Sequence, residues 1–302
     1  MGNADQKNVE RKLNELKRLT GLSLHMDLPD AAELPAHEAE EAASYILHQL
    51  DALISSYKET NSKEAIYKRW ITGDIETHEL IHTAKRFHIP LAAYRSVFLA
   101  ETNETMDNSV MTILKHAFPD TAYTWLVPMS SCQLAIVCTF AEEVTEEELH
   151  STAYLVLVRV NVSYSAVTEH LNQLPGAYQE AGLALNVGKI FYPGQYVYPY
   201  NKLGIGRLIY GLSRERCSAY LKEVLGTDSP DFFQPETVHV INCFLDNNLN
   251  IAETTRRLHM HRNTLIYRLE QIQKETGLDI RQFHDAMTLK TVLFVINYMK
   301  NL

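Results

Sequence analysis

The sequence has few cysteines and no long apolar run. Its four cysteines, Cys132, Cys138, Cys217 and Cys243, are scattered and form no C-x-x-C pair, and the first two fall in a stretch that we expect to be a buried strand. Buried free thiols in a reducing cytosol fit this pattern better than a disulfide framework. No apolar run approaches the roughly 20 residues that a membrane span needs, and no basic segment followed by an apolar one opens the chain. We therefore expect a cytoplasmic protein without a membrane partner.

The chain also lacks an excess of positive charge. It has 28 Lys plus Arg against 37 Asp plus Glu, a formal net charge of −9. This charge argues against nucleic acid coating the whole chain, but it allows one local basic patch. The 302 residues, 46% of them hydrophobic, can bury more than one core, so we expect two or three domains.

Residues 1–88 are expected to form a helical N-terminal region. Val9, Leu13 and Leu16 recur at helical spacing, and after Pro35 a longer stripe follows: Ala39, Ala42, Ile46, Leu50, Leu53 and Tyr57. Such a narrow stripe fits either a bundle within the chain or a helix pair between two subunits. Two shorter helices are expected at 63–70 and 76–87, with Thr72 or Asp74 available as a cap between them.

From Pro90 the pattern alternates between strands and helices, which predicts an α/β sandwich at 89–212. Strands are expected at 94–100, 123–127, 133–140, 158–163 and 196–200, and helices at 108–117, 145–157, 175–187 and 203–212. A helix at 214–225 and a loop at 226–230 make 213–234 a linker. Residues 235–302 are expected to form a separate all-α domain, so the fold class is multidomain α and α/β.

The segment HELIHTAKRFH, from His78 to His88, contains H-E-x-x-H with another His six residues later. Zinc peptidases present three imidazoles and a glutamate base at this spacing. In that motif a glycine at the eighth position lets the chain leave the helix, and here Lys85 occupies the position.

On a continued helix His78 and His82 share a face, but His88 points elsewhere. The opposite face is apolar, since it carries Leu80, Ala84 and Phe87. We therefore expect an ordinary amphipathic helix and no metal site, with a zinc metallopeptidase as the remote alternative.

The C-terminal region has the pattern of a helix-turn-helix between Asn248 and Gln273. After a helix at 236–246, a short helix at about 251–258 and a longer one from Arg262 are joined by His259, Met260 and His261. Met260 is the apolar residue that lets the two helices cross. The longer helix is expected to bury a stripe of three residues, Leu265, Leu269 and Ile272.

The opposite face of the longer helix carries side chains that can read the major groove. An arginine fork pairs with guanine, asparagine pairs with adenine, and threonine or tyrosine reaches phosphate or a thymine methyl group. Residues of the short helix can hold backbone phosphates. Between Asn250 and Glu275 five basic residues stand against three acidic ones. The candidate DNA-binding residues are Arg262, Asn263, Thr264, Tyr267, Arg268, His261, Thr254, Thr255 and Arg257.

This region resembles the C-terminal helix-turn-helix of PucR/CdaR-type bacterial transcription regulators, whose core is H-R-N-T-[LVI]-x-Y-R-L followed by a T-G-L/D segment. Residues 261–269 and 276–279 carry all of that core. Residues 176–185 and 200–212 are similar to the end of the degenerate GGDEF-like domain that precedes the helix-turn-helix in this family. The resemblance covers roughly residues 65–300.

The resemblance implies a degenerate GGDEF-like domain without cyclase activity. Cyclases of the parent fold carry G-G-[DE]-[EF] in a hairpin turn, where glycines admit the nucleotide and a carboxylate holds the metal. The equivalent turn here is Ser130-Ser131-Cys132-Gln133, which has neither glycine nor acid. We therefore expect no catalytic residue, no metal and no cofactor.

The resemblance further implies a sequence-specific transcription regulator of a catabolic or metabolic operon. Its expected partners are double-stranded DNA, a second copy of the chain on paired half-sites, and a small-molecule effector. The last helix, with Ala286, Leu289, Leu293 and Ile296, either closes the domain or helps to form the dimer. A helix-turn-helix-like protein-interaction module without DNA affinity is the alternative function. The effector, the operator and the choice between activator and repressor stay open.

Overall fold

The structure is a computed structural model, and it describes residues 3–20, 36–60, 62–118, 124–154 and 160–302. The chain divides into two compact units, Met1–Phe87 and His88–Leu302. Several sequence expectations fall outside the described residues, namely Pro35, the start of the strand at 123 and the segment 155–159; the side chains of Ala39 and Tyr57 also lie outside them. Within the described part, no helix is long and apolar enough to cross a membrane.

In the first unit, helices α1 (Asn3–Thr20) and α2 (Ala36–Thr60) pack against each other through Val9, Leu16, Leu50 and Ile54. The Lys58 ammonium lies 2.7 Å from the Glu15 carboxylate across the pair. The apolar stripe allowed a helix pair either within the chain or between two subunits, and the structure shows α1 and α2 paired within one chain. The expected places of Ala42 and Leu53 in the stripe are wrong, because Ala42 is exposed, Leu53 is 54% exposed, and Ile54, four residues after Leu50, is buried instead.

Helices α3 (Lys63–Thr72) and α4 (Thr77–Arg86) agree closely with the expected helices. Ser62 caps α3, since its hydroxyl accepts a bond from the Ala65 amide at 3.1 Å. Gly73 ends the helix at φ 82°, a left-handed conformation that glycine adopts without strain. The expected cap at Thr72 or Asp74 is wrong, because their side chains bond to each other and Glu76 occupies the N-cap position of α4.

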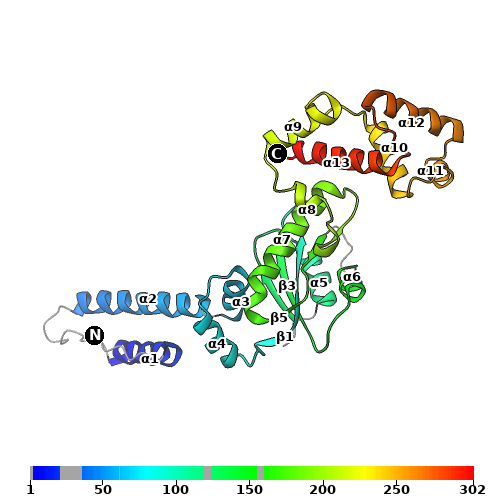
Figure 1. The fold of residues 1–302 in the computed structure, drawn as a ribbon. Helices are drawn as coiled ribbons and strands as arrows, with labels where there is room; N and C mark the ends of the chain where they lie inside the picture. Colours follow the sequence, from blue (N-terminus) through cyan, green and yellow to red (C-terminus); the bar gives the residue numbers. More distant parts are fainter. Residues whose placement is uncertain (1–2, 21–35, 61, 119–123, 155–159) are drawn as a thin grey trace. The chain divides into compact units, whose positions relative to one another are not determined.

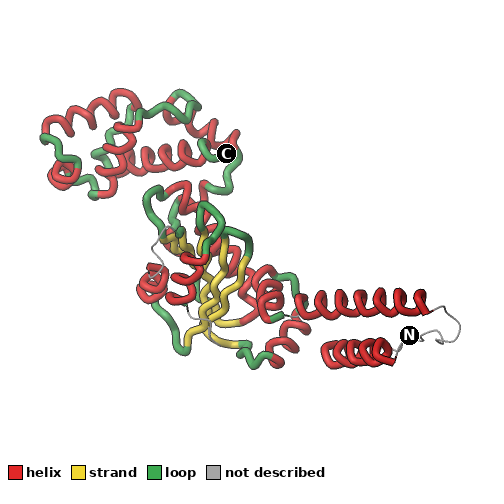
Figure 2. The backbone as a smooth tube through the Cα atoms, turned by 180° about the vertical axis from the view of Figure 1, so that it is seen from behind, coloured by secondary structure: helices red, strands yellow, loops and turns green. Residues whose placement is uncertain are grey.

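The second unit begins with a six-stranded sheet in the order β2-β3-β1-β4-β6, with β5 paired to β1. Strands β1, β3 and β5 are labelled in Figure 1. The strands are β1 (Ala92–Glu101), β2 (Thr124–Pro128), β3 (Gln133–Phe140), β4 (Asn161–Tyr164), β5 (Thr168–His170) and β6 (Val197–Pro199). The β4–β6 pair is parallel, and the other pairs are antiparallel. Figure 2 shows these strands side by side in one sheet, with helices outside it.

Helices cover both faces of this sheet. On one face α5 (Asn108–Ala117) and α6 (Glu146–Tyr154) share a core with β1, β3 and β4, in which Phe98, Leu114 and Leu149 are buried. On the other face lies α7 (Leu174–Phe191), where the Ser163 hydroxyl of β4 donates to the Ala181 carbonyl at 2.7 Å. The expected α/β sandwich is confirmed.

The thiols are free, and Cys138, Cys217 and Cys243 are buried as expected. Burial raises the pKa of the Cys138 thiol to about 12, so it stays protonated. Cys132 does not lie in a buried strand as expected. It is half-buried in the turn before β3, because β3 begins only at Gln133.

The rest of the second unit is helical, with short 3₁₀ turns at Leu171–Gln173 and Tyr200–Lys202. The helices are α8 (Gly206–Ile209), α9 (Arg214–Leu225), α10 (Pro235–Asp246), α11 (Ile251–Arg257), α12 (Arg262–Thr276) and α13 (Phe283–Met299). The expected helix at 203–212 is wrong in length, because Gly204 turns the chain at φ 51° and only four residues beyond it are helical.

The C-terminal end of α7 shares a core with α9 to α13. Phe191 packs on Phe294 of α13, with ring centroids 5.1 Å apart, and the Tyr298 hydroxyl donates to the Tyr210 carbonyl. The four residues expected to close the domain or form a dimer are all buried, so they close the domain: Ala286, Leu289, Leu293 and Ile296.

Candidate DNA-binding site

Helices α10, α11 and α12 form a helix-turn-helix. Asn250 caps α11, since its side-chain oxygen accepts a bond from the Glu253 amide at 3.1 Å. His259 adopts φ 50° in the turn, and the Met260 amide then donates to the Thr255 carbonyl at 3.0 Å. Met260 is partly buried against the domain core, as the sequence predicted. The turn therefore fixes how α12 leaves α11.

Helix α12 buries one face and exposes the other. Leu265, Leu269 and Ile272 are almost fully buried, as expected. Arg262, Asn263, Thr264 and Tyr267 are exposed, Tyr267 by 61%, and Arg268 is half-buried. The polar groups are thus offered to solvent from a helix that the core holds in place.

The N-terminus of α12 has the electrostatics of an anion site. His261 occupies the N-cap position without a side-chain hydrogen bond to the helix, and the first turn holds no acidic residue. The first backbone amides of a helix have no partner within the helix, and the helix dipole adds partial positive charge there. A phosphate group can take these amides as donors.

The candidates on α11 differ from one another. Arg257 is exposed, and Thr255 is half-buried with its hydroxyl donating to the Ala252 carbonyl at 2.9 Å. Thr254 is fully buried, and its hydroxyl donates to the Asn250 carbonyl at 2.8 Å. The expected phosphate contact of Thr254 is therefore not available from this position, because the side chain is in the core and its proton is engaged.

The segment after α12 holds that helix against α13. Gly277 ends α12 at φ 75°, and the Asp279 carboxylate then pairs with the Arg281 guanidinium at 2.7 Å. Arg281 also donates to the Gln273 side chain of α12 at 3.0 Å, while the Asp279 amide donates to Asp285 of α13 at 2.8 Å. The hydrogen bond from Arg281 lowers the pKa of Asp279.

The HELIH segment forms α4, and its geometry differs from a zinc site. The Glu79 carboxylate is bound by both terminal nitrogens of Arg69, at 2.7 and 2.9 Å, and this bond lowers the pKa of Glu79. The imidazole of His78 lies 3.2 Å from the Glu76 carboxylate, and His88 lies beyond the helix at φ 56°. Across the residues the structure describes, no group of three or more His, Cys, Asp and Glu side chains could hold a metal ion.

The turn expected to correspond to the cyclase motif joins β2 and β3 as a hairpin, closed by the Met129 amide donating to the Gln133 carbonyl at 2.9 Å. The loop after β1 lies against this turn, since the Thr102 amide donates to the Cys132 carbonyl at 3.0 Å. That loop lines a polar cavity of about 400 Å³.

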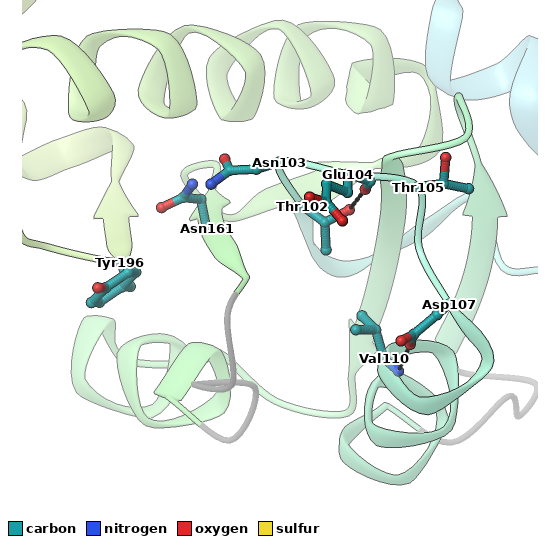
Figure 3. A pocket seen from close by; sticks show the side chains of 8 residues that line it. All are labelled: Thr102, Asn103, Glu104, Thr105, Asp107, Val110, Asn161 and Tyr196. Carbon is teal, nitrogen blue, oxygen red and sulfur yellow. Dashed lines mark hydrogen bonds between the residues drawn. The ribbon is translucent and has the colours of Figure 1, made fainter.

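Figure 3 shows the carboxamides of Asn103 and Asn161 next to one another in this cavity, with Tyr196 at its edge. Asp107 also lines it, but its carboxylate caps α5 by accepting from the Val110 amide at 2.8 Å. The carboxylate of Asp107 is therefore engaged in holding α5.

The fold and the exposed face of α12 together define a helix-turn-helix protein in which an α/β domain precedes the helix-turn-helix. Residues 237–294 match the PucR C-terminal helix-turn-helix domain, and residues 72–187 match a GGDEF-like domain. The chain therefore carries a PucR-type C-terminal helix-turn-helix domain and, before it, a GGDEF-like domain.

Relatives share parts of this chain. The purine catabolism regulatory protein of Bacillus subtilis is 26% identical over 135 residues, 44% of this chain and 25% of that protein. An uncharacterized protein of Haemophilus influenzae is 29% identical over 119 residues, 39% of this chain and 32% of that protein. The matched stretches thus span less than a third of these relatives' own length.

Among solved structures, the regulator of polyketide synthase expression from Bifidobacterium adolescentis is similar with a TM-score of 0.40 and 19% identity. The similarity covers 79% of this chain and 93% of that one.

Proposed function

We propose that this chain is a cytoplasmic, sequence-specific DNA-binding regulator of transcription that controls a catabolic or metabolic operon. The observation that carries the proposal is the division of α12, which buries three apolar residues and exposes Arg262, Asn263, Thr264 and Tyr267. The domain limits 1–88, 89–212, 213–234 and 235–302 form part of the proposal. It includes no catalytic role, because the β2–β3 turn has neither glycine nor carboxylate.

In the proposed complex the N-terminal half of α12 enters the major groove. Arg262 and Asn263 read base edges or the adjacent phosphates, Arg268 follows one and a half turns later, and Thr264 and Tyr267 support them. His261, Thr255 and Arg257 hold the backbone phosphates on either side of the turn. Because the whole chain is acidic, the interaction depends on this local surface, and salt weakens it.

The proposal includes a homodimer. One helix contacts too few base pairs for useful specificity, so two copies are expected on half-sites about 34 Å apart, one helical turn of DNA. The buried residues of α13 close their own domain. The dimer contact therefore involves other surfaces of the chain.

The proposal also includes control by a small metabolite. One relative is a regulator of purine catabolism by its name, which supports a catabolic operon as the target here. Activation and repression both agree with this proposal.

The test compares Arg262→Ala and Asn263→Ala with the wild type on genomic fragments that the wild-type protein selects, at one fixed salt concentration. Each variant is expected to lose about 1–3 kcal/mol of binding free energy, or roughly 5- to 150-fold in Kd. Arg216→Ala is the matched control, because Arg216 is an exposed arginine on α9, outside the helix-turn-helix.

Equal affinity of wild type and both variants would contradict the placement of α12 in the groove. A wild-type protein that selects no fragment at all would favour the protein-interaction module instead.

A further inference from the structure

A cleft of about 630 Å³ lies in the α/β domain, between α6, the end of α7 and β6. Four tyrosines line it: Tyr154 of α6, Tyr192 at the end of α7, Tyr196, and Tyr198 of β6. Tyr154 and Tyr196 are 49% and 55% exposed. Aromatic rings that remain in contact with water inside a concave site offer flat surfaces for stacking. We refer to this site as the tyrosine cleft.

The tyrosine cleft contains a cation and no acid. Lys202 lines it, and no aspartate or glutamate does, although acidic residues outnumber basic ones in the chain. Among the described residues, no carboxylate lies within ion-pair distance of the Lys202 ammonium. The ammonium is therefore available to an anion that enters the cleft.

His150 adds a neutral polar group to the tyrosine cleft. Burial, followed by the charge of Lys202, lowers the pKa of this imidazole, and the Glu146 carboxylate opposes the shift, so the net effect favours the uncharged form. Its Nδ1 lies 3.3 Å from the Tyr164 hydroxyl, which holds the ring. The Glu146 carboxylate already has hydrogen-bond partners, because it accepts from the Tyr164 hydroxyl at 3.2 Å and from the Asn201 side-chain amide at 3.3 Å. The cleft thus offers a hydrogen-bonding nitrogen and a positive charge, and the Glu146 carboxylate near His150 is engaged by Tyr164 and Asn201.

We propose that the tyrosine cleft binds a planar aromatic or heteroaromatic anion of metabolite size. The ring of the ligand stacks on the tyrosines, its anionic group pairs with Lys202, and His150 forms a hydrogen bond with a polar atom of the ring. A cavity of this volume suits a small metabolite. The proposal rests on the proposed function, for which it supplies the effector site.

The tyrosine cleft also contacts α13, which shares a core with α10 and α12. The ring of Tyr192 meets Phe294 of α13 edge-on, with centroids 5.7 Å apart at 83°. The Tyr192 hydroxyl donates to the Leu203 carbonyl at 2.8 Å, and Leu203 is buried in the core that α13 shares with α10 and α12. A ligand stacked on Tyr192 therefore acts on a side chain in direct contact with α13.

The test measures binding of three probes to the full chain by isothermal titration calorimetry. The probes are 2-naphthoate, the planar neutral naphthalene-2-carboxamide, and the non-planar anion cyclohexanecarboxylate. The first is expected to bind about tenfold or more tightly than either of the others, since only it combines stacking with a charge-assisted bond.

Lys202→Gln is expected to weaken 2-naphthoate binding about tenfold and to leave the carboxamide unchanged. Tyr196→Ala should weaken both planar probes. Both residues are exposed, so both variants should fold. Lys115→Gln on α5 is the control for loss of one exposed lysine and should bind like the wild type.

Absence of 2-naphthoate binding at millimolar concentration would overturn the proposal, as would equal binding by the wild type, Lys202→Gln and Tyr196→Ala. These results are separate from the DNA-binding experiment. A chain that binds 2-naphthoate in the cleft but selects no DNA contradicts the proposed function only, and a chain that selects DNA but does not bind the probe contradicts the cleft only.

Discussion

Two glycines of α7 should respond to alanine in opposite directions. A Cβ atom at Gly188 would lie 2.2 Å from both Cγ and Cδ1 of Tyr198, a β6 residue that is only 4% exposed. A Cβ atom at Gly182 would meet only Leu99 Cδ1, at 3.9 Å, which is an ordinary contact. The same helix therefore contains a test position and a matched control.

The size of each effect follows from these distances. Carbon atoms pack at about 3.5 Å or more, so the Tyr198 ring would have to retreat by roughly 1.3 Å within a closed core. Overpacking of this kind costs about 1–3 kcal/mol, and the gain of about 1 kcal/mol from replacing a helical glycine offsets part of it. Gly188→Ala should thus lose about 1–2 kcal/mol of unfolding free energy, whereas Gly182→Ala should gain about 0.5–1 kcal/mol.

Thermal unfolding followed by tryptophan fluorescence measures both effects, because Trp125 is buried in the same sheet. A change of 1 kcal/mol corresponds to about 2–4 °C in Tm for a unit of this size. Tyr198→Ala removes both ring atoms but keeps the Tyr198 Cβ, which would lie 2.8 Å from the added atom, so the cost of Gly188→Ala should fall in that background without vanishing. Equal shifts for Gly182→Ala and Gly188→Ala, or an undiminished cost in the Tyr198→Ala background, would refute the packing argument.

Three further predictions concern the other sites. His259→Gly should raise the unfolding free energy by about 0.5–1 kcal/mol, since His259 holds φ 50° in the turn; a loss of stability in urea unfolding would count against this. Because the pKa of Asp279 is lowered in the folded state, its ionised carboxylate stabilises the fold above the ordinary carboxyl pKa near 4, and this stability is lost as the pH falls through the lower folded-state pKa. The difference in unfolding free energy between wild type and Asp279→Asn should therefore stay constant from neutral pH to about 5 and narrow below about 4. A difference that widens in acid would disprove this prediction. His78→Ala and His82→Ala should leave DNA binding intact, and metal analysis of the purified protein should find no stoichiometric zinc. Tightly held zinc that is present in the wild type and absent from these variants would instead support a metal site in α4.

The elements that the sequence predicts best are those with local signals. Helix α5 has its expected limits because Asp107 caps its first turn, and β3 begins where the hairpin turn ends. The buried stripe of α12 follows from helical spacing alone, since a helix held on one side must bury that side. In each case, residues close together in the sequence were sufficient to predict the limits or the buried face of the element.

The features that the sequence does not predict depend on partners far along the chain. Leu53 and Ile54 both suit the stripe of α2 at helical spacing, and only the packing of α1 selects Ile54. Strand β5 has three residues, too few for a periodic pattern, and is defined by its pairing with β1. Thr254 looks like a surface residue in the sequence, but tertiary packing buries it.

The tyrosine cleft was missed for the same reason. Its residues come from α6, the end of α7 and β6, and no local motif connects them. The available signal was the number of tyrosines at 192–200, where four of nine residues are tyrosine.

Helix α7 belongs to two cores at once, because its middle lies on the sheet while Ala184, Val187 and Phe191 are buried with α13. The proposed helix-turn-helix domain at 235–302 therefore shares its core with the last turns of α7. A fragment that starts at residue 235 would leave Phe294 and Tyr298 without their aromatic neighbour Phe191, and it should aggregate or melt early. Grafting this DNA-binding region onto another protein would require transplanting the last turns of α7 with it.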